Sequence, residues 1–298
     1  MPISEEYESI DHKQKHAALI RPDGRRLDGR KLDELRPLSL KVGILGQADG
    51  SAYITHGNNK ILVAVYGPRE LHPKHMIQAE KARVRVEYRL APFSVQERKS
   101  PAPKRREHEL SKVIQEAVEP SIFTERFPRA AIDIFVQVLD ADGGTRAASI
   151  TAASLALADA GIPLKGLVSS VAVGKVAGKI VLDLFDAEDK EGESDLPIAV
   201  LSTGKQITLC QMDGNMTKDE VAEAISMALK GCETIHEMQR SVLMEKYKTM
   251  EPKTPAEEAD VAIAESGGRG ETDEGRTDGE TTSEPIEEDF DITEEEFE

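Results

Sequence analysis

Short runs in which apolar and polar residues alternate dominate the first third of the chain, and this period predicts β-strands. Three such runs are separated by turns that contain Gly46, Gly50, Gly57 and Asn58, which is typical of an antiparallel meander. They cover residues 38–45, 51–56 and 61–66. Residues 82–90 alternate strictly, with three of four charged side chains on one face being arginines. We therefore predict a sheet with one apolar face and one polar, basic face.

Three later segments carry apolar residues at helical spacing. The first begins at Arg105 and Arg106 and stops at Pro120, the second is an alanine-rich segment over residues 145–160, and the third runs over residues 218–250. The third is amphipathic, and it carries Val221, Ile225, Leu229, Cys232 and Ile235 on one face. A strand over residues 131–139 precedes the second helix, and two hairpins between the second and third helices cover residues 167–184 and 198–211.

Three segments lack a regular pattern, and we predict that they are not helices or strands. Residues 21–36 are charged and rich in turn formers, residues 91–104 form a basic loop with three prolines, and residues 185–195 form an acidic loop. Together with the strands and helices, these segments predict a mixed α/β (α+β) fold.

The acidic residues are concentrated at the end of the chain. Residues 251–298 hold 19 acidic and 3 basic residues, whereas residues 1–250 hold 36 acidic and 35 basic residues. The last segment has two aromatic residues among Gly, Thr, Ser and Glu, so it offers little apolar surface to bury. We predict a polar leader over residues 1–20, one domain over residues 21–250 and a disordered acidic tail over residues 251–298. The tail either only solvates the protein, or it docks on a basic partner or competes with RNA.

The composition argues against membrane insertion and against a disulfide or zinc framework. No run approaches the roughly 18 apolar residues of a membrane-spanning helix, and no secretory leader is visible, so we expect a soluble, cytoplasmic protein. Cys210 and Cys232 stand alone, without a partner at metal-ligand spacing.

A glycine turn before the second helix is a candidate anion site. Gly143 and Gly144 precede Thr145 and Arg146, so backbone N–H groups, the positive end of a helix dipole, a hydroxyl and a guanidinium can converge on one phosphate. The same residues also suit an ordinary helix start. A phosphate loop of the Walker type is excluded, because no Gly-Lys-Ser/Thr follows the glycines.

Two charged groups are further candidates for chemistry. The acidic loop holds Glu188, Asp189, Glu191, Glu193 and Asp195, and crowded carboxylates raise one another's pKa until one can act as a general acid, or share a divalent cation. The alternative is a solvated acidic turn. The arginine pair that starts the first helix suits phosphodiester binding and also suits a surface helix.

Several of these segments together resemble the RNase PH family, including its catalytic members in archaeal exosomes. The matching pieces lie in order between residues 21 and about 245. They read RPDGRRLDGRKLDELRPL, VYGPRELHPKH, APFSVQERKSPAPKRREHELSKVI, DADGGTR, ASLALADAGIP and LDLFDAEDKEGESDLPIAV. The resemblance covers neither the leader nor the acidic tail. It implies a pair of βαβ-type halves packed as one domain, and phosphorolysis of single-stranded RNA from its 3′ end.

The resemblance also implies roles for individual residues. Inorganic phosphate, as co-substrate, is expected at Gly144, Thr145, Arg146 and Arg106. Asp195 matches the general acid and Asp189 its paired carboxylate, while Arg105, Lys74 and Arg98 are expected to handle RNA. Some bacterial relatives have a lysine two residues after the acid, where this chain has Pro197, so magnesium or manganese at Asp189 and Asp195 is left open.

The expected partners are single-stranded RNA, an inactive RNase PH-like paralogue that alternates with this chain in a hexameric ring, and RNA-binding cap subunits. Two other functions compete with phosphorolysis. A non-catalytic ring subunit would only guide RNA, but such members lack the arginines and the acid that this chain keeps. A hydrolytic nuclease with two metals would leave the glycine turn without a role, and no histidine accompanies the carboxylates in sequence.

Overall fold

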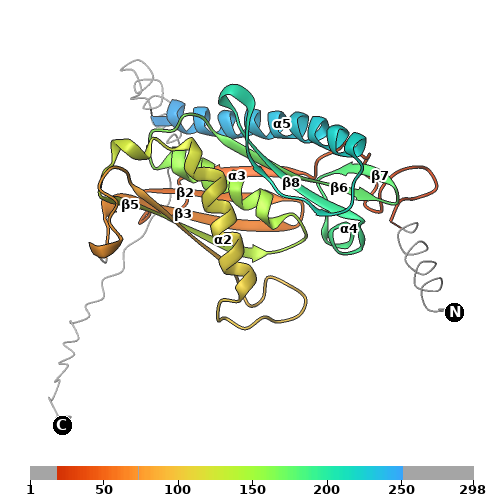
Figure 1. Ribbon diagram of the computed structural model, residues 1–298, viewed down its shortest axis with the longest axis horizontal. Coiled ribbons are helices and arrows are strands. Elements are labelled where there is room, and N and C mark those ends of the chain that lie inside the picture. Colours follow the sequence, from red (N-terminus) through yellow and green to blue (C-terminus); the bar gives the residue numbers. More distant parts are fainter. Residues whose placement is uncertain (1–18, 73, 251–298) are drawn as a thin grey trace, which may run out of the picture. The chain divides into compact units, whose positions relative to one another are not determined.

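The computed structural model describes residues 19–72 and 74–250, and these residues form two five-stranded sheets with helices packed on them (Figure 1). The first sheet has the order β1-β2-β3-β5-β4. Strands β1 to β3 form the predicted antiparallel meander, and β5 continues the antiparallel pattern. Strand β4 lies parallel to β5, and helix α2 connects the two. The bounds are β1 Leu38–Val42, β2 Gly50–His56, β3 Asn59–Glu70, β4 Arg83–Leu90, α2 Arg105–Val118 and β5 Ala130–Asp140.

The second sheet has the order β10-β8-β6-β7, with β9 also paired to β8, and every pairing in it is antiparallel. Both hairpins predicted from the sequence are present. The bounds are β6 Val168–Val176, β7 Lys179–Leu182, β8 Ser194–Leu201, β9 Gln206–Cys210 and β10 Asp213–Gly214. Four 3-10 turns complete the connections, at Lys74–Met76, Glu119–Ser121, Thr124–Arg126 and Thr203–Lys205.

Helix α3 (Thr145–Asp159) lies between the two sheets, and its residues from Ala147 to Leu157 are all buried. Small side chains allow this close approach on both sides. On one side, a Cβ atom at Gly50 of β2 would come within 2.4 Å of the Ala156 carbonyl oxygen. On the other, the Ser170 N–H of β6 donates to the Thr151 hydroxyl at 3.1 Å. The core therefore runs through α3 from sheet to sheet, and the start of α3 is fixed relative to both.

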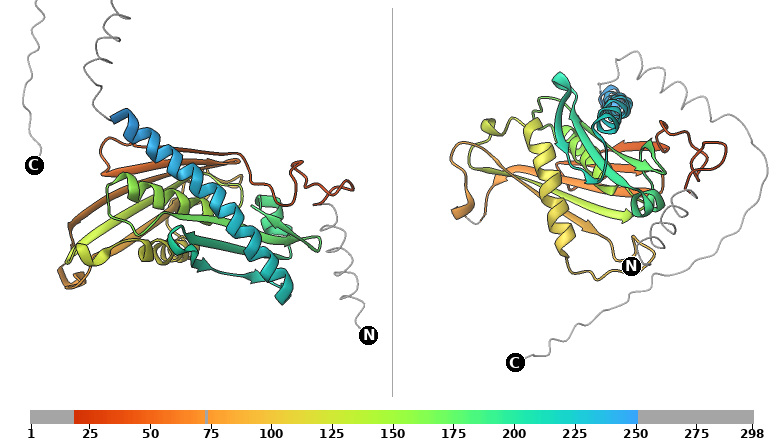
Figure 2. Two further views of the ribbon diagram at one scale, coloured as in Figure 1. Left: turned by 90° about the horizontal axis from the view of Figure 1, so that it is seen from above. Right: turned by 45° about the vertical axis from the view of Figure 1, so that its right-hand side comes forward.

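Helix α5 (Lys218–Met250) covers the face of the second sheet that points away from α3 (Figure 2). The apolar face predicted for this helix is confirmed for four of its five residues. Cys232 and Ile235 are buried, and Ile225 and Leu229 are half-buried and pack against the core of the second sheet, while Val221 is half-buried near the start of the helix. The buried positions of α5 also include small or polar residues that the sequence did not single out: Ala224, Ala228, Gly231 and Gln239. Close packing favours them, since a Cβ at Gly231 would lie 3.2 Å from Leu182 of β7.

The prediction of an acidic loop over residues 185–195 was also partly wrong. The segment forms the short helix α4 (Asp186–Glu191), and Asp195 lies within strand β8. Glu188 points into the protein, is fully buried and pairs with Arg26. This pairing joins residues 162 positions apart, so the local sequence gives no sign of it.

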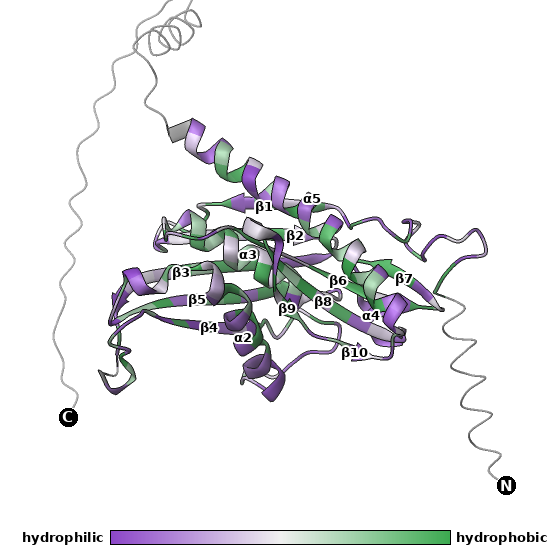
Figure 3. Cartoon of the chain, turned by 45° about the horizontal axis from the view of Figure 1, so that its top comes forward, coloured by the Kyte–Doolittle hydropathy of each residue, from purple (hydrophilic) through white to green (hydrophobic). Residues whose placement is uncertain are grey.

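The mixed α/β fold predicted from the sequence is confirmed. In Figure 3, hydrophobic residues (green) predominate along β8, whereas hydrophilic residues (purple) predominate at the start of α2. The segment over residues 21–36 contains turns and no helix, as predicted. No helix among the described residues is long and apolar enough to cross a membrane. The predicted acidic tail lies outside the described residues, as does the predicted leader up to residue 18.

Candidate active site

A pocket of about 980 Å³ opens where the basic loop, α2, α3, α4 and β8 meet. This volume suits a nucleotide-sized ligand. Seven residues predicted from the sequence as site residues line it: Arg98, Arg106, Gly144, Thr145, Arg146, Asp189 and Asp195. The fold therefore brings together three segments that lie up to 97 positions apart in the chain.

The glycine turn at the start of α3 requires its two glycines for different reasons. Both adopt left-handed backbone angles, with φ of +67° at Gly143 and +65° at Gly144. A Cβ at Gly143 would lie 2.6 Å from the backbone carbon of Phe185, so only glycine lets the start of α4 approach the turn. Gly144 is the N-cap of α3 and supplies no side-chain cap. The N–H groups of the first helical turn thus remain available to an anion.

Two side chains hold this turn from behind. The Asn59 amide donates to the Gly143 carbonyl oxygen at 2.6 Å and accepts from the Asp142 N–H at 2.6 Å. The Arg36 guanidinium donates to the Asp142 carbonyl oxygen at 2.6 Å. These contacts occupy the carbonyl oxygens of the turn, so that its N–H side can face the pocket.

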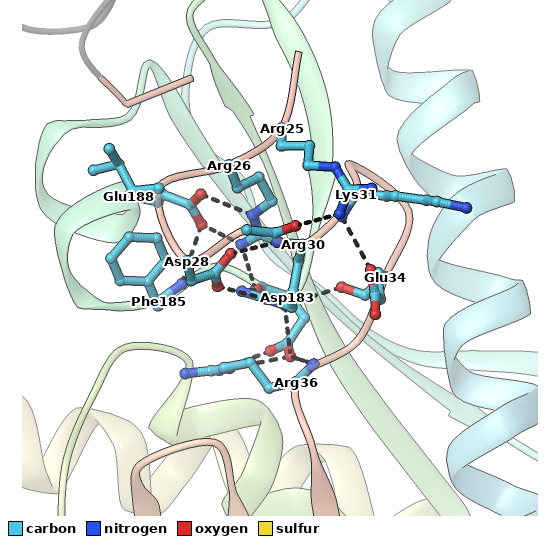
Figure 4. Close-up of polar contacts among 12 residues, drawn as sticks. Arg25, Arg26, Asp28, Arg30, Lys31, Glu34, Arg36, Asp183, Phe185 and Glu188 are labelled. Atoms are coloured by element: carbon cyan, nitrogen blue, oxygen red, sulfur yellow. Dashed lines mark hydrogen bonds and ion pairs between the residues drawn. The ribbon is translucent and has the colours of Figure 1, made fainter. Parts of the chain in front are cut away.

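Arg36 belongs to a buried group of polar and charged side chains that we call the Asp183 cluster: Arg26, Arg30, Arg36, His56, Asp183 and Glu188. Figure 4 shows five of its members, namely Arg26, Arg30, Arg36, Asp183 and Glu188. Asp183 accepts from the Arg36 backbone N–H at 2.7 Å, from its guanidinium at 2.7 and 3.0 Å, and from the His56 ring at 2.9 Å. Burial alone would raise the pKa of Asp183. The charges and hydrogen bonds of His56 and Arg36 instead hold it well below its usual range.

The same cluster anchors helix α4. Arg26 makes a two-point ion pair with Glu188, including a contact of 2.8 Å from Nε, and also donates to the Asp183 carbonyl oxygen at 2.7 Å. Glu188 directly precedes Asp189, so the ion pair fixes the helix that carries this pocket carboxylate. The Asp183 cluster therefore fixes both the glycine turn and α4.

The pocket arginines contrast with the arginines of the Asp183 cluster, because the fold leaves them largely unpaired. Arg106 is exposed and has no ion pair within residues 19–72 and 74–250. Arg146 donates to the Gln211 side chain at 2.8 Å, but its Nε is buried without a hydrogen-bond partner. Buried donors are normally satisfied, so this nitrogen points to a ligand.

The helix start that carries Arg106 is itself well fixed. Glu107 is buried, and its carboxylate accepts from the Lys104 N–H at 2.8 Å and from the Leu90 N–H of β4 at 3.0 Å. In the first contact, the side chain of Glu107 at position N3 accepts from the backbone N–H of the N-cap residue Lys104, as in a capping box. It ties the N-terminus of α2 to the end of β4 beside the pocket.

The two predicted carboxylates have raised pKa values. Burial and the neighbouring negative charges of Asp189 and Asp213 raise the pKa of Asp195 to about 6. Burial raises the pKa of Asp189 as well, against the lowering effect of Arg106 and Arg146. The Asp195 Oδ1 atom is buried without a hydrogen-bond partner. A carboxyl group in this state can hold a proton near neutral pH and release it to a reacting oxygen.

The described residues contain no group of three His, Cys, Asp or Glu side chains arranged to hold a metal ion. A cation at Asp189 and Asp195 would have two carboxylates and would depend on substrate oxygens and water for its remaining ligands, as Mg²⁺ often does. The predicted metal site therefore stays a prediction.

The residues predicted to bind RNA are placed to different extents. Arg98 lines the pocket. Arg105 is exposed at the first position of α2, next to Arg106, and does not line the pocket. Lys74 belongs to the 3-10 turn Lys74–Met76, and its side chain is not among those described, so its predicted role stays a prediction.

Sequence reasoning missed several residues that shape the site, namely Arg36, Asn59, Tyr88, Gln211 and Asp213. Two signals were present. Arginines recur through the segment over residues 21–36, which is unusual for a plain solvated turn. Tyr88 lies between Glu87 and Arg89 in the alternating segment over residues 82–90, and so on its apolar face, where a phenol needs a hydrogen-bond partner. Gln211 and Asp213 carry no comparable local signal.

Two family profiles match consecutive parts of the chain. The sequence profile of the first domain of the 3′ exoribonuclease family RNase PH matches residues 34–163, and the profile of its second domain matches residues 166–231. Exosome complex component Rrp41 of Thermococcus onnurineus is 57% identical over 235 residues, which cover 79% of this chain and 94% of the relative. Rrp41 of Methanopyrus kandleri is 56% identical over 235 residues, which cover 79% and 98%.

Solved structures share the fold. Rice Rrp46 superimposes with a TM-score of 0.66 at 26% identity and covers 73% of this chain and all of its own. A chain of the Archaeoglobus fulgidus exosome with RNA bound to the active site gives a TM-score of 0.66 at 21% identity, covering 76% of this chain and 98% of that one. At this identity the second match speaks for the fold alone.

Proposed function

The chain belongs to the RNase PH family of 3′ exoribonucleases, and on that premise we propose that it degrades single-stranded RNA from the 3′ end by phosphorolysis. Inorganic phosphate is the co-substrate, and nucleoside diphosphates are the products. The observation that carries this proposal is the pocket itself. Two arginines from different helices, one with a buried unpaired nitrogen, face two carboxylates whose pKa values are raised.

In the proposed reaction, phosphate binds between Arg106, Arg146, the Thr145 hydroxyl and the N–H groups that follow Gly144. These groups offset its charge and the charge that develops on the phosphoryl oxygens. An oxygen of the bound phosphate attacks the phosphorus of the last phosphodiester, and the bond from that phosphorus to the 3′ oxygen breaks. Asp195 gives its proton to the departing 3′ oxygen, and the proton carried by the phosphate restores it.

Asp189 has a supporting part in this reaction, because its negative charge helps to keep Asp195 protonated. Arg98 on the pocket wall, together with Arg105 and Lys74, is proposed to hold the RNA backbone. A magnesium or manganese ion at Asp189 and Asp195 would add positive charge near the substrate phosphates. No step of the reaction is routed through it.

The relatives carry the name exosome complex component, and we propose the corresponding partners for this chain. It would alternate with an inactive RNase PH-like paralogue in a hexameric ring, with RNA-binding subunits as a cap. The retained pocket arginines and Asp195 argue against a purely RNA-guiding subunit. A two-metal hydrolase would leave the glycine turn and the unpaired Arg146 nitrogen without a role.

Product analysis tests the proposal. The chain, alone and assembled with its ring partner, is incubated with single-stranded RNA in the presence and absence of phosphate, and the products are separated by chromatography. Phosphorolysis predicts nucleoside diphosphates that appear only with phosphate. Nucleoside monophosphates without phosphate would indicate hydrolysis, and binding without any product from the assembled ring would indicate an RNA-guiding subunit.

A further inference from the structure

Tyr88 contributes a hydroxyl group to the pocket wall that the proposed reaction does not use. It lies in β4, its side chain is fully buried, and it lines the pocket. Its phenol donates a hydrogen bond to the Thr145 hydroxyl oxygen at 3.0 Å. The contact joins the first sheet to the first residue of α3, at the proposed phosphate site.

The position of Tyr88 is fixed from the other side as well. Its backbone N–H donates to the Ser111 hydroxyl of α2 at 2.9 Å, and that hydroxyl donates to the Glu107 carbonyl oxygen at 2.6 Å. Tyr88 therefore sits between the helix that carries Arg106 and the helix that carries Arg146. Its hydroxyl has little freedom to point elsewhere.

The direction of this hydrogen bond decides where the threonine proton goes. A hydroxyl has one proton to donate and two lone pairs to accept. When Tyr88 donates to Thr145, the threonine proton is left for another acceptor. Burial raises the pKa of Tyr88 to about 12, so the phenol keeps the proton that it donates to Thr145 at neutral pH.

We propose that Tyr88 is a positioning residue, which orients the Thr145 hydroxyl proton toward inorganic phosphate bound at the start of α3. This inference rests on the proposed phosphate site. Tyr88 does not touch the phosphate. Its contribution is to prevent the threonine hydroxyl from rotating away, so that the donor is already aligned when phosphate arrives.

The test removes a single oxygen atom. Tyr88→Phe keeps the ring and deletes the hydroxyl, and Tyr66→Phe makes the same change at a half-buried tyrosine that packs against Phe135 and does not line the pocket. Inorganic phosphate binding to the full chain in its ring is measured by calorimetry. Phosphorolysis is then measured with phosphate varied at saturating RNA, and with RNA varied at saturating phosphate.

For Tyr88→Phe we expect the phosphate Kd and KM to rise about fivefold to tenfold, the range of one neutral hydrogen bond, with an unchanged RNA KM. Tyr66→Phe should change neither constant. In a Thr145→Val background, Tyr88→Phe should add nothing, because the hydroxyl it orients is gone. Thermal unfolding of each variant checks that the fold is intact. If Tyr88→Phe does not fold, the comparison is repeated with Thr145→Ser. The serine hydroxyl rotates more freely than that of threonine, so this variant should also bind phosphate more weakly.

An unchanged phosphate Kd in folded Tyr88→Phe would overturn the inference, and so would an equal rise of the phosphate and RNA constants. A full additive effect of Tyr88→Phe in the Thr145→Val background would also contradict it. Failure of the proposed function is distinguishable. If the wild-type ring binds phosphate but releases no nucleoside diphosphate, the phosphorolysis proposal fails, while the binding comparison still decides the role of Tyr88.

Discussion

The Asp183 cluster and the charges of the pocket are adjacent, and both combine arginines with carboxylates. They differ in whether these charged groups have partners within the protein. In the Asp183 cluster, Asp183 is saturated by Arg36 and His56, and Glu188 is paired with Arg26. In the pocket, an Arg146 nitrogen and an Asp195 oxygen are buried without a partner.

This difference separates stability from function. A buried ion pair whose hydrogen bonds are all made is destabilised strongly when one partner is lost. A buried polar atom without a partner lowers stability and is retained in a fold where a ligand supplies the missing partner. The carboxyl pKa values follow the same division, because that of Asp183 lies well below its usual range and that of Asp195 is raised to about 6.

The largest expected effect is on catalysis by Asp195→Asn. This change removes the proposed proton donor and no cationic contact to RNA, so turnover should fall by about 10²–10⁴-fold while RNA binding is retained. Single-turnover phosphorolysis and RNA binding by the assembled ring measure the two quantities. A rate within a few-fold of wild type would remove Asp195 from the role of general acid.

The next effect is on stability, from Asp183→Asn. Loss of this carboxylate leaves buried arginines unpaired, and we expect the free energy of unfolding at pH 7 to fall by about 3–5 kcal/mol in chemical denaturation. Glu233→Gln, which breaks an exposed pair with Lys205, is the matched control and should change it by less than about 1 kcal/mol.

The pH dependence of that loss has a definite sign. The pKa of folded Asp183 is lowered, so its contribution is present above the unfolded carboxyl pKa of about 3.9 and is lost as pH falls toward the folded value. The difference between wild type and Asp183→Asn should be constant from pH 8 to 5 and shrink below about pH 4. A difference that grows with acidity would contradict this account of the cluster.

A third effect separates two neighbouring arginines. Arg106→Lys and Arg146→Lys should each raise the phosphate KM by about tenfold or more, because an ammonium cannot reproduce the two-point contact of a guanidinium with phosphate. Arg105→Lys, one residue from Arg106 but outside the pocket lining, should leave the phosphate KM unchanged. An equal response of Arg105 and Arg106 variants would place both on the RNA path instead.

The smallest expected effect is on the stability of Asp195→Asn, which should gain stability at high pH, whereas Asp183→Asn loses it. Because the folded pKa of Asp195 is raised to about 6, the stability that its neutral form provides is full below about pH 4 and is lost as pH rises through 6. Asp195→Asn should therefore unfold like wild type at pH 4 and be about 1 kcal/mol more stable at pH 8, after allowance for partial exposure of the carboxylate. Lower stability of the variant at pH 8 would refute the idea that the pocket carboxylate is uncompensated.

Much of this fold could be predicted from the sequence, because periodicity is a local property. The alternation of residues 82–90 and the proline at position 120 mark β4 and the end of α2 to within a residue or two. Long-range pairing was not visible. Helix α4 depends on Arg26, and the depth at which α5 packs depends on Gly231 and its neighbours, so neither could be inferred from hydrophobicity.

The candidate site shows the same limit. Residues with an evident chemical signature, such as the Gly144–Arg146 turn and the crowded carboxylates, were identified from the sequence, and the fold brings them together. The residues that position them were not. Arg36 and Asn59 act on the glycine turn through its carbonyl oxygens from more than 80 positions away, and no local pattern records such a contact.

The central claim is that the unpaired pocket charges bind inorganic phosphate as a reactant, and isotopic labelling tests it most directly. The assembled ring is given unlabelled single-stranded RNA and ³²P-labelled orthophosphate, and the released nucleotides are separated. The account predicts that the label enters the β position of nucleoside diphosphates, at a rate that collapses in Asp195→Asn. Release of nucleoside monophosphates by the wild-type ring, with no label in any released nucleotide, would contradict it.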